Sequence, residues 1–200
     1  MFWTCFFIAI GAYLIGSLSP AVILSVGVMK RDVRDFGSGN AGTTNMLRTF
    51  GWKMATLTFI LDVAKGAVVM LLARAIGGEV GMLVGGIAVS AGHNWPIYYG
   101  FRGGKGIATT LGVMLVAMPV ESLVVLAIAL IVMAISKMVS LGSLVGLILE
   151  VAAAIIFHTQ DILLIVTVVA LALLAFLGHR ANIKRILAGE EPPISFKKKS

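Results

Sequence analysis

The chain alternates long apolar stretches with short polar segments, and this alternation limits its fold more than any other feature. Hydrophobic residues make up 59% of the 200-residue sequence, charged residues make up 12%, and the mean hydropathy is +1.03. A membrane-spanning helix needs about 20 predominantly apolar residues, and shorter stretches fit with local bilayer thinning. We therefore predict an all-α integral membrane protein, a single polytopic domain over residues 1–200 with seven transmembrane helices near residues 2–28, 53–73, 80–97, 106–118, 121–136, 141–157 and 161–178.

Basic residues distinguish the two sides of this predicted membrane protein. The connections after the second, fourth and sixth stretches carry one base, Arg74, and Lys65 lies inside the second stretch. The other fourteen of the sixteen Lys and Arg residues fall on the opposite side. Because cytoplasmic loops carry the excess of Lys and Arg, we expect the N-terminus outside and the C-terminus in the cytoplasm, which requires an odd number of spans. No base precedes Lys30, so the first stretch is predicted to be an uncleaved span.

Three glycine-rich polar segments lie on the predicted cytoplasmic side, at residues 37–48, 92–106 and 178–185. In the first, three glycines fall within six residues, and such a segment lets backbone N–H groups converge on a phosphate or carboxylate at a helix N-terminus. If a helix begins near Thr43, Arg48 presents its planar guanidinium to the same anion. The alternative is a surface loop that ends in a helix cap. The candidate binding residues here are Ser38, Gly39, Asn40, Gly42, Thr44, Asn45 and Arg48.

The second segment contains Gly103-Gly104-Lys105-Gly106, which lacks the spacing of a Walker phosphate-binding loop. Glycines on both sides allow Lys105 to approach a phosphate closely, so Gly103, Gly104 and Lys105 are candidate site residues. The alternative is that Lys105 only sets the membrane orientation.

The third segment places His179, Asn182 and Arg185 near one face of a helix that continues out of the last apolar stretch. We predict His179 and Asn182 as site residues, although a lone histidine at a helix end is commonly only a polar cap. Ser143 is a possible additional hydroxyl donor. Asp62 and Lys65, three residues apart in the second stretch, are expected to pair inside the helix bundle, either as simple charge compensation or as part of a functional site.

Several classes of chemistry are disfavoured by what the sequence lacks. A single cysteine, Cys5, allows no internal disulfide and no cysteine-based metal site. The cytoplasmic acids Asp32, Asp35, Glu190 and Glu191 do not have metal-ligand spacing, so neither a metal nor another cofactor is expected. There is no Gly-x-Ser-x-Gly elbow and no histidine followed five positions later by aspartate. Membrane orientation accounts for the net charge of +7, so no nucleic-acid partner is expected.

The polar residues that remain, taken together, resemble the bacterial PlsY family, the glycerol-3-phosphate acyltransferases that use acyl-phosphate as donor. The resemblance runs along nearly the whole chain and is carried by Asp32, Arg34, Gly37, Ser38, Gly39, Asn40, Gly42, Thr44, Asn45, Arg48, Asp62, Lys65, Gly66, Gly92, His93, Asn94, Pro96, Phe101, Gly103, Gly104, Lys105, Gly106, His179, Asn182, Ile183, Arg185, Gly189 and Glu191.

This resemblance implies an enzyme of the bacterial inner membrane with its active site facing the cytoplasm. Its substrates would be acyl-phosphate and glycerol 3-phosphate, with membrane lipid as its surroundings, and its products lysophosphatidic acid and phosphate. Ser38, Asn40, Gly42 and Thr44 would hold the donor phosphate. Arg48 and Lys105 would stabilise departing phosphate, while His179 and Asn182 would orient glycerol 3-phosphate with help from Ser143. Either His179 or a substrate phosphate would take the hydroxyl proton.

A transporter for a phosphorylated anion is the strongest alternative from another functional class. Such a protein is expected to have inverted repeats and a polar path that reaches the far side of the membrane. Neither is visible in the sequence, where the outer connections hold mainly Glu79, Glu121, His158 and Asp161.

Overall fold

The computed structural model describes residues 1–194, and every regular element in that range is helical. The prediction of an all-helical chain is therefore confirmed for the described residues. The elements are α1 (Phe2–Ser17), α2 (Pro20–Gly27), the 3-10 helix η1 (Val33–Asp35), α3 (Thr43–Phe50), α4 (Trp52–Asn94), the 3-10 helix η2 (Ile97–Tyr99), α5 (Ile107–Ala117), α6 (Pro119–Ser136), α7 (Val139–Phe157) and α8 (Ile162–Leu187).

Five helical segments within residues 1–194 are long and apolar enough to cross a membrane. α5 is also apolar, but its 11 residues rise only about 16 Å, which is short of a bilayer's hydrocarbon thickness. The count of seven spans and the orientation of the termini stay predictions. The five segments are Phe2–Gly27, Trp52–Tyr99, Pro119–Ser136, Val139–Phe157 and Ile162–Leu187.

The first apolar stretch contains two helices instead of one continuous helix. α1 ends at Ser17, and Pro20 occupies the first turn of α2, where a missing backbone N–H is tolerated. Ser19 caps α2 by accepting a hydrogen bond from the backbone nitrogen of Val22 at 3.4 Å. The chain therefore changes direction at Ser19, before it reaches the first glycine-rich segment.

α4 is a helical hairpin that reverses within the connection expected at residues 74–79. Gly78 adopts φ 59° and ψ −147°, a conformation that only glycine adopts readily. Beyond this turn, the backbone at Gly81 lies directly against the carbonyl of Ala73, and Gly85 lies against the Ala73 side chain. Their lack of a β-carbon lets the two antiparallel arms of α4 approach closely, as small residues do where membrane helices pack.

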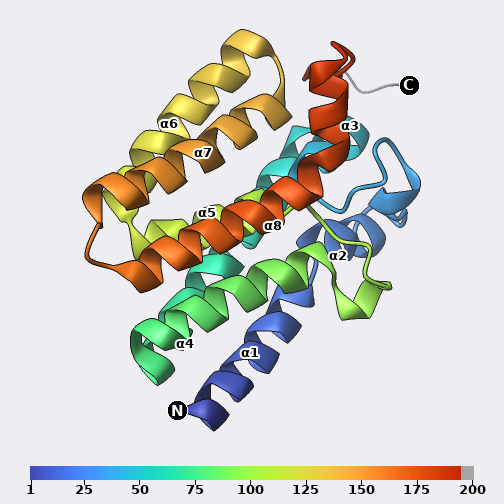
Figure 1. The fold of residues 1–200 in the computed structure, drawn as a ribbon. Helices are drawn as coiled ribbons and strands as arrows, with labels where there is room; N and C mark the ends of the chain where they lie inside the picture. The colour runs from blue at the N-terminus through green and yellow to red at the C-terminus, as the bar shows by residue number, and fades with distance from the viewer. Residues whose placement is uncertain (195–200) are drawn as a thin grey trace.

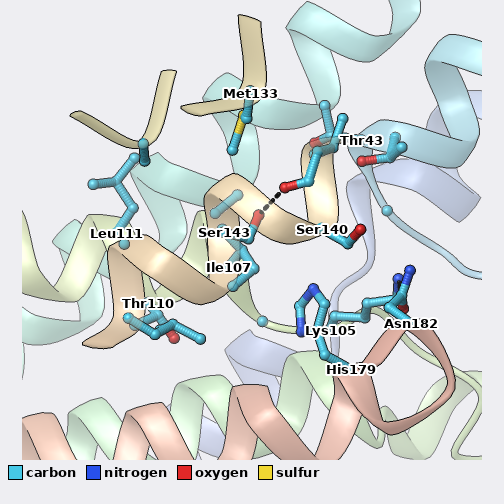
Figure 2. A pocket seen from close by; sticks show the side chains of 18 of the residues that line it. Thr43, Lys105, Ile107, Thr110, Leu111, Met133, Ser140, Ser143, His179 and Asn182 are labelled. Atoms are coloured by element: carbon cyan, nitrogen blue, oxygen red, sulfur yellow. Dashed lines mark hydrogen bonds between the residues drawn. The ribbon is translucent and has the colours of Figure 1, made fainter. Parts of the chain in front are cut away.

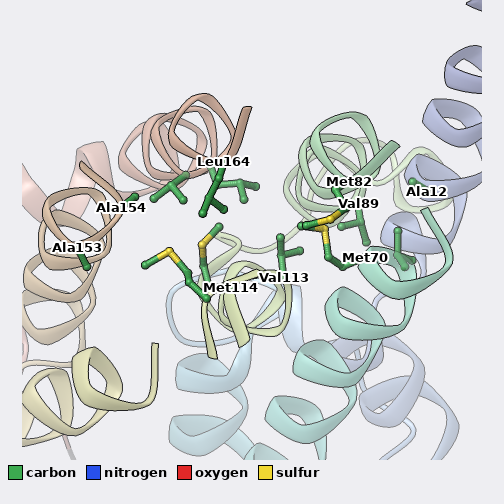
Figure 3. Close-up of a cluster of buried hydrophobic side chains, with 13 residues drawn as sticks. Ala12, Met70, Met82, Val89, Val113, Met114, Ala153, Ala154 and Leu164 are labelled. Carbon is green, nitrogen blue, oxygen red and sulfur yellow. The ribbon is translucent and has the colours of Figure 1, made fainter. Parts of the chain in front are cut away.

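The bundle has two sides that α8 joins, as Figure 1 shows: α1 packs with α4, α6 packs with α7, and α8 contacts both α4 and α7. A buried apolar cluster lies where these helices meet (Figure 3). It includes Met70 and Val89 from the two arms of α4, Met114 from α5, Ala154 from α7 and Leu171 from α8. Because this cluster contains residues from α1, α4, α5, α7 and α8, it packs the two sides of the bundle together, and so helps to position the helix ends next to the polar segments.

Candidate functional site

The three glycine-rich segments meet at one cavity of about 310 Å³ (Figure 2). α3, the loop before α5, α7 and α8 all contribute side chains to its polar end. Gly39, Gly103 and Gly104 belong to the loops but do not line the cavity. The predicted site residues that do line it are Ser38, Asn40, Gly42, Thr44, Asn45, Arg48, Lys105, Ser143, His179 and Asn182.

The first glycine-rich loop is shaped by the side chain of Asn45. Its Oδ1 atom accepts a hydrogen bond from the backbone nitrogen of Ser38 at 3.0 Å, and its Nδ2 atom donates to the carbonyls of Val33 and Phe36, each at 2.9 Å. Gly37 turns the chain with φ 60°, and a β-carbon there would collide with Asn45. α3 then begins at Thr43, as predicted, so its N-terminal turn and Thr44 border the cavity.

An ion pair between Arg34 and Asp32 holds the segment that leads into the first glycine-rich loop. Arg34 donates to the Asp32 carboxylate, with Nη2 and Oδ2 2.7 Å apart, and to the carbonyl of Tyr99 at 2.8 Å. The hydrogen bond from Arg34 outweighs partial burial and holds the pKa of Asp32 below its ordinary value. In addition, the backbone nitrogen of Ala41 donates to Gly103 at 3.2 Å. These contacts join the first and second glycine-rich segments.

The second loop owes its shape to His93 at the end of α4. The backbone nitrogen of Gly104 donates to the carbonyl of His93 at 3.0 Å, and a β-carbon on Gly104 would collide with the His93 ring. Gly103 likewise lies against the backbone of His93 and Asn94. Close packing of the two glycines thus turns the next residue, Lys105, into the cavity, where Figure 2 shows it beside Asn182.

His93 also joins the predicted Asp62–Lys65 pair. Lys65 Nζ lies 2.8 Å from Asp62 Oδ1 and 2.9 Å from His93 Nδ1, and it donates to the carbonyls of Gly16 and Leu18 at 3.2 and 3.0 Å. Asp62 and His93 are buried. The cluster pairs as expected and ties the end of α1 to both arms of α4, and two of its members, Asp62 and His93, also line the cavity.

Lys105 is the ammonium group at the centre of the polar end. Its Nζ atom donates to Asn182 Oδ1 at 2.6 Å. Burial lowers the pKa of Lys105 to about 8; Glu191 opposes this effect, whereas Arg185 and Arg48 add to it. A lysine with this pKa gains a proton readily when an anion arrives, because the anion stabilises the charged form.

His179 is oriented by its own helix. Its Nδ1 atom lies 2.8 Å from the carbonyl of Ala175, which can only accept, so Nδ1 carries the proton. In the neutral ring, Nε2 is then an acceptor. His179 is buried and lines the cavity. Ser143 also lines it, with its hydroxyl donating to the carbonyl of Val139 at 2.9 Å (Figure 2).

Glu191 was not predicted as a site residue, yet it lies at the centre of the hydrogen-bond network. Its carboxylate accepts from Ser140 Oγ at 2.7 Å, Asn182 Nδ2 at 2.6 Å and Arg185 Nε at 2.8 Å. Burial acts to raise the pKa of Glu191, but these three hydrogen bonds outweigh it and keep the pKa below its ordinary value. Arg48 Nη2 donates to the next carbonyl, that of Pro192, at 3.4 Å. The tail therefore folds back onto the site.

The far end of the cavity is mostly apolar, and it holds one carboxyl group that was not predicted as a site residue. Side chains of α5, α6 and α7 line it, including Leu111, Val125 and Leu147. Glu150 lines it too and accepts a hydrogen bond from Ser122 at 3.3 Å. A carboxyl group inside an apolar stretch was the available signal for Glu150.

The cavity thus combines an anion-binding end with an apolar limb. Arg48, Lys105 and Arg185 supply positive charge, and neutral Ser, Thr and Asn side chains supply donors. Within residues 1–194, no group of three or more His, Cys, Asp or Glu side chains is placed to hold a metal ion. Such a site is suited to positioning a phosphate beside an apolar chain and to stabilising negative charge that develops between them.

Comparisons with known proteins show the family of this chain. The family model described as glycerol-3-phosphate acyltransferase matches residues 6–189. A glycerol-3-phosphate acyltransferase of Thermoanaerobacter pseudethanolicus is 46% identical over 189 residues, covering 94% of this chain and 95% of the relative. One of Clostridioides difficile is 45% identical over 199 residues, covering 96% of each.

Two solved structures share the fold. Both are of PlsY (YgiH), described as an integral membrane glycerol 3-phosphate acyltransferase, one in its glycerol 3-phosphate form and one in its lysophosphatidic acid form. They superpose with TM-scores of 0.89 and 0.84 at 32% and 31% identity, and each comparison covers 96% of both chains. The chain therefore belongs to the glycerol-3-phosphate acyltransferase family of integral membrane proteins.

Proposed function

We propose that this chain transfers a fatty acyl group from acyl-phosphate to the 1-hydroxyl of glycerol 3-phosphate, giving lysophosphatidic acid and inorganic phosphate. The observation that carries the proposal is the cavity itself, in which Arg48 and Lys105 face the same space as an apolar limb between α5, α6 and α7. This pairing suits a reaction in which a water-soluble phosphate meets an acyl chain. Family membership supports the same reaction.

The first loop and the cationic side chains hold the phosphate groups in this proposal. Ser38, Asn40 and Thr44, with backbone N–H groups at the start of α3, bind the phosphate of the acyl donor. Arg48 and Lys105 neutralise charge on the phosphate as it departs. Their place at the polar end of the cavity supports these roles.

His179 and Asn182 orient glycerol 3-phosphate from α8. To bind substrate, the amide of Asn182 exchanges part of its present contacts with Lys105 and Glu191 for contacts with the ligand. Ser143 is a further donor from α7 if its hydroxyl rotates away from Val139. Gly103 and Gly104 serve by packing against His93, which places Lys105 in the cavity, and Gly39 serves by turning the first loop at φ 69°.

The chemical step balances without a further reactant. The 1-hydroxyl oxygen attacks the acyl carbonyl carbon, a new C–O bond forms, and the C–O bond to phosphate breaks as inorganic phosphate leaves. The hydroxyl proton passes either to Nε2 of His179 or to a phosphate oxygen, whose second pKa lies near 6. The donors around the cavity stabilise the oxyanion that forms on the acyl carbonyl oxygen after the hydroxyl attacks and before phosphate leaves.

We further propose a bacterial inner-membrane location with seven spans, the N-terminus outside and the cavity open to the cytoplasm. The distribution of Lys and Arg supports this orientation. Counted separately, the two arms of α4 raise the five long segments to six, and the short apolar helix α5 supplies the seventh crossing with local bilayer thinning. Cysteines introduced at Arg74 and at Lys53 of a Cys5→Ser variant, which removes the native thiol near the N-terminus, test it with a membrane-impermeant reagent: only the cysteine at position 74 is expected to react from outside.

Product formation in detergent tests the reaction itself. Purified protein is mixed with radiolabelled glycerol 3-phosphate and palmitoyl-phosphate, and the label is extracted into organic solvent. We expect label in the organic phase only when both substrates are present. A transporter for phosphorylated anions would give none, because detergent leaves no compartment to transport between.

A further inference from the structure

The cavity has a second end, about 15 Å along α7 from the anion-binding residues, and a carboxyl group lies there. The lining runs from Ser140 past Leu147 to Glu150, and ten residues of α-helix rise about 15 Å. Met114 of α5 and Val125 of α6 line the cavity beside it. These three helices therefore enclose a limb that ends at Glu150.

Glu150 is fixed at this end by a hydrogen bond between helices. Ser122 Oγ on α6 donates to Glu150 Oε2 at 3.3 Å, and both residues are buried, at 0% and 7% exposure. Among the described residues of α5, α6 and α7 that line the cavity, Glu150 is the only titratable one. It takes no part in the network of Lys105, Asn182 and Glu191, so anion binding does not explain it.

We propose that the Glu150–Ser122 pair closes the acyl-chain limb and limits the length of the acyl chain that the enzyme accepts. The inference rests on the proposed function, because it takes the apolar limb to hold the acyl chain. Each methylene that enters apolar surroundings improves binding about fourfold. An acyl chain long enough to reach the pair separates the Glu150 carboxyl group from the Ser122 hydroxyl, and both groups lose their hydrogen bond. Chains that end before Glu150 are therefore preferred.

The test is a chain-length profile. For the detergent-purified full chain, kcat/KM is measured with saturated acyl-phosphates from octanoyl to stearoyl at saturating glycerol 3-phosphate. Glu150→Ala removes the carboxyl group and opens the limb, and we expect the preferred chain to lengthen by about two methylenes, a change of about sixteen-fold in the ratio of long to short chains. Ile148→Ala is the matched control, because Ile148 lies on the same helix with 57% of its surface exposed.

A reciprocal variant keeps the test decisive if Glu150→Ala does not fold. Val125→Phe fills the same end from α6, and we expect it to shift preference toward shorter chains. An unchanged profile in the variants that fold overturns the proposal and leaves Glu150 as a contact between helices. If the unmodified protein forms no lysophosphatidic acid with any chain length, the proposed function fails instead, so the two failures are distinguishable.

Discussion

The ammonium group of Lys105 lies 2.6 Å from the side-chain oxygen of Asn182, and this contact joins the second glycine-rich segment to the third across 77 residues of sequence. The same asparagine donates its nitrogen to Glu191 at 2.6 Å. Asn182 is therefore held between a cation and a carboxylate. A phosphate that enters the cavity replaces contacts that already exist, so the donors are oriented before substrate arrives.

Activity is expected to fall as pH rises through about 8, the lowered pKa of buried Lys105. Above this pH the neutral amine no longer attracts phosphate, so kcat/KM for glycerol 3-phosphate tends toward a tenfold loss per pH unit. Lys105→Arg is the control, because a guanidinium stays charged throughout this pH range. If kcat/KM of Lys105→Arg falls above pH 8 in the same way, a group other than Lys105 is responsible for the loss.

This loss is not expected to reflect unfolding. The pKa of Lys105 is about 8 when folded and 10.5 in its ordinary state, so between these values the unfolded chain binds more protons. For this group, stability therefore rises with pH across that interval. Melting temperatures measured at pH 8 and pH 9.5 check this contribution. Between the two pH values, the unmodified protein is expected to gain stability relative to Lys105→Arg.

His179→Gln separates the two acceptors for the hydroxyl proton. Glutamine keeps hydrogen-bonding groups near Ala175 but is not a base. If substrate phosphate takes the proton, kcat at saturating glycerol 3-phosphate stays within about threefold and KM alone rises. If His179 is the base, kcat falls by about 10²- to 10⁴-fold, the usual contribution of general-base catalysis.

Glu191→Gln is expected to lower kcat/KM by about tenfold or more. The carboxylate orients Asn182 and pairs with Arg185, and a hydrogen bond to a charged group contributes about 1.5–3 kcal/mol. Glu190→Gln is the matched control, since Glu190 is the preceding residue and is exposed. Equal activities for the two variants, or a gain in Glu191→Gln, would contradict a positioning role for this carboxylate.

Gly104→Ala is expected to destabilise the protein and to lower activity together. Its β-carbon would collide with the His93 ring, so the loop that carries Lys105 must shift. Gly11→Ala is the comparison, because a β-carbon at Gly11 of α1 meets nothing within 4 Å. A melting temperature and a KM that stay unchanged in Gly104→Ala would show that the close packing is unimportant.

The helices and the composition of the site were predictable because they depend on local sequence. Apolar stretches require helices in lipid, since every backbone polar group must be satisfied within the segment. The reversal of α4 fell within the expected connection, at Gly78. The basic residues predicted that the three polar segments lie on one side of a small bundle, where they are close together. As a result, ten of the thirteen predicted site residues line one cavity.

The remaining features depend on contacts between distant segments. Glu191 follows the last helix, and its sequence surroundings do not indicate that the tail folds back to Ser140, 51 residues earlier. His93 completes the Asp62–Lys65 pair only because the arms of α4 are antiparallel. The hydrogen bond that Glu150 accepts from Ser122 could not be predicted either, because it depends on how α6 packs against α7. The break before Pro20 did have a local signal, the proline itself.

The most direct test of the site compares two arginines. Arg48 lines the cavity, whereas Arg180 is exposed on α8 and does not line it. In detergent-purified proteins of confirmed folding, kcat/KM for lysophosphatidic acid formation is predicted to fall on the order of 100-fold in Arg48→Ala, since a charge-assisted contact to phosphate is lost. Arg180→Ala is predicted to stay within about twofold of the unmodified enzyme. Comparable losses in the two variants would contradict the assignment of this cavity as the active site.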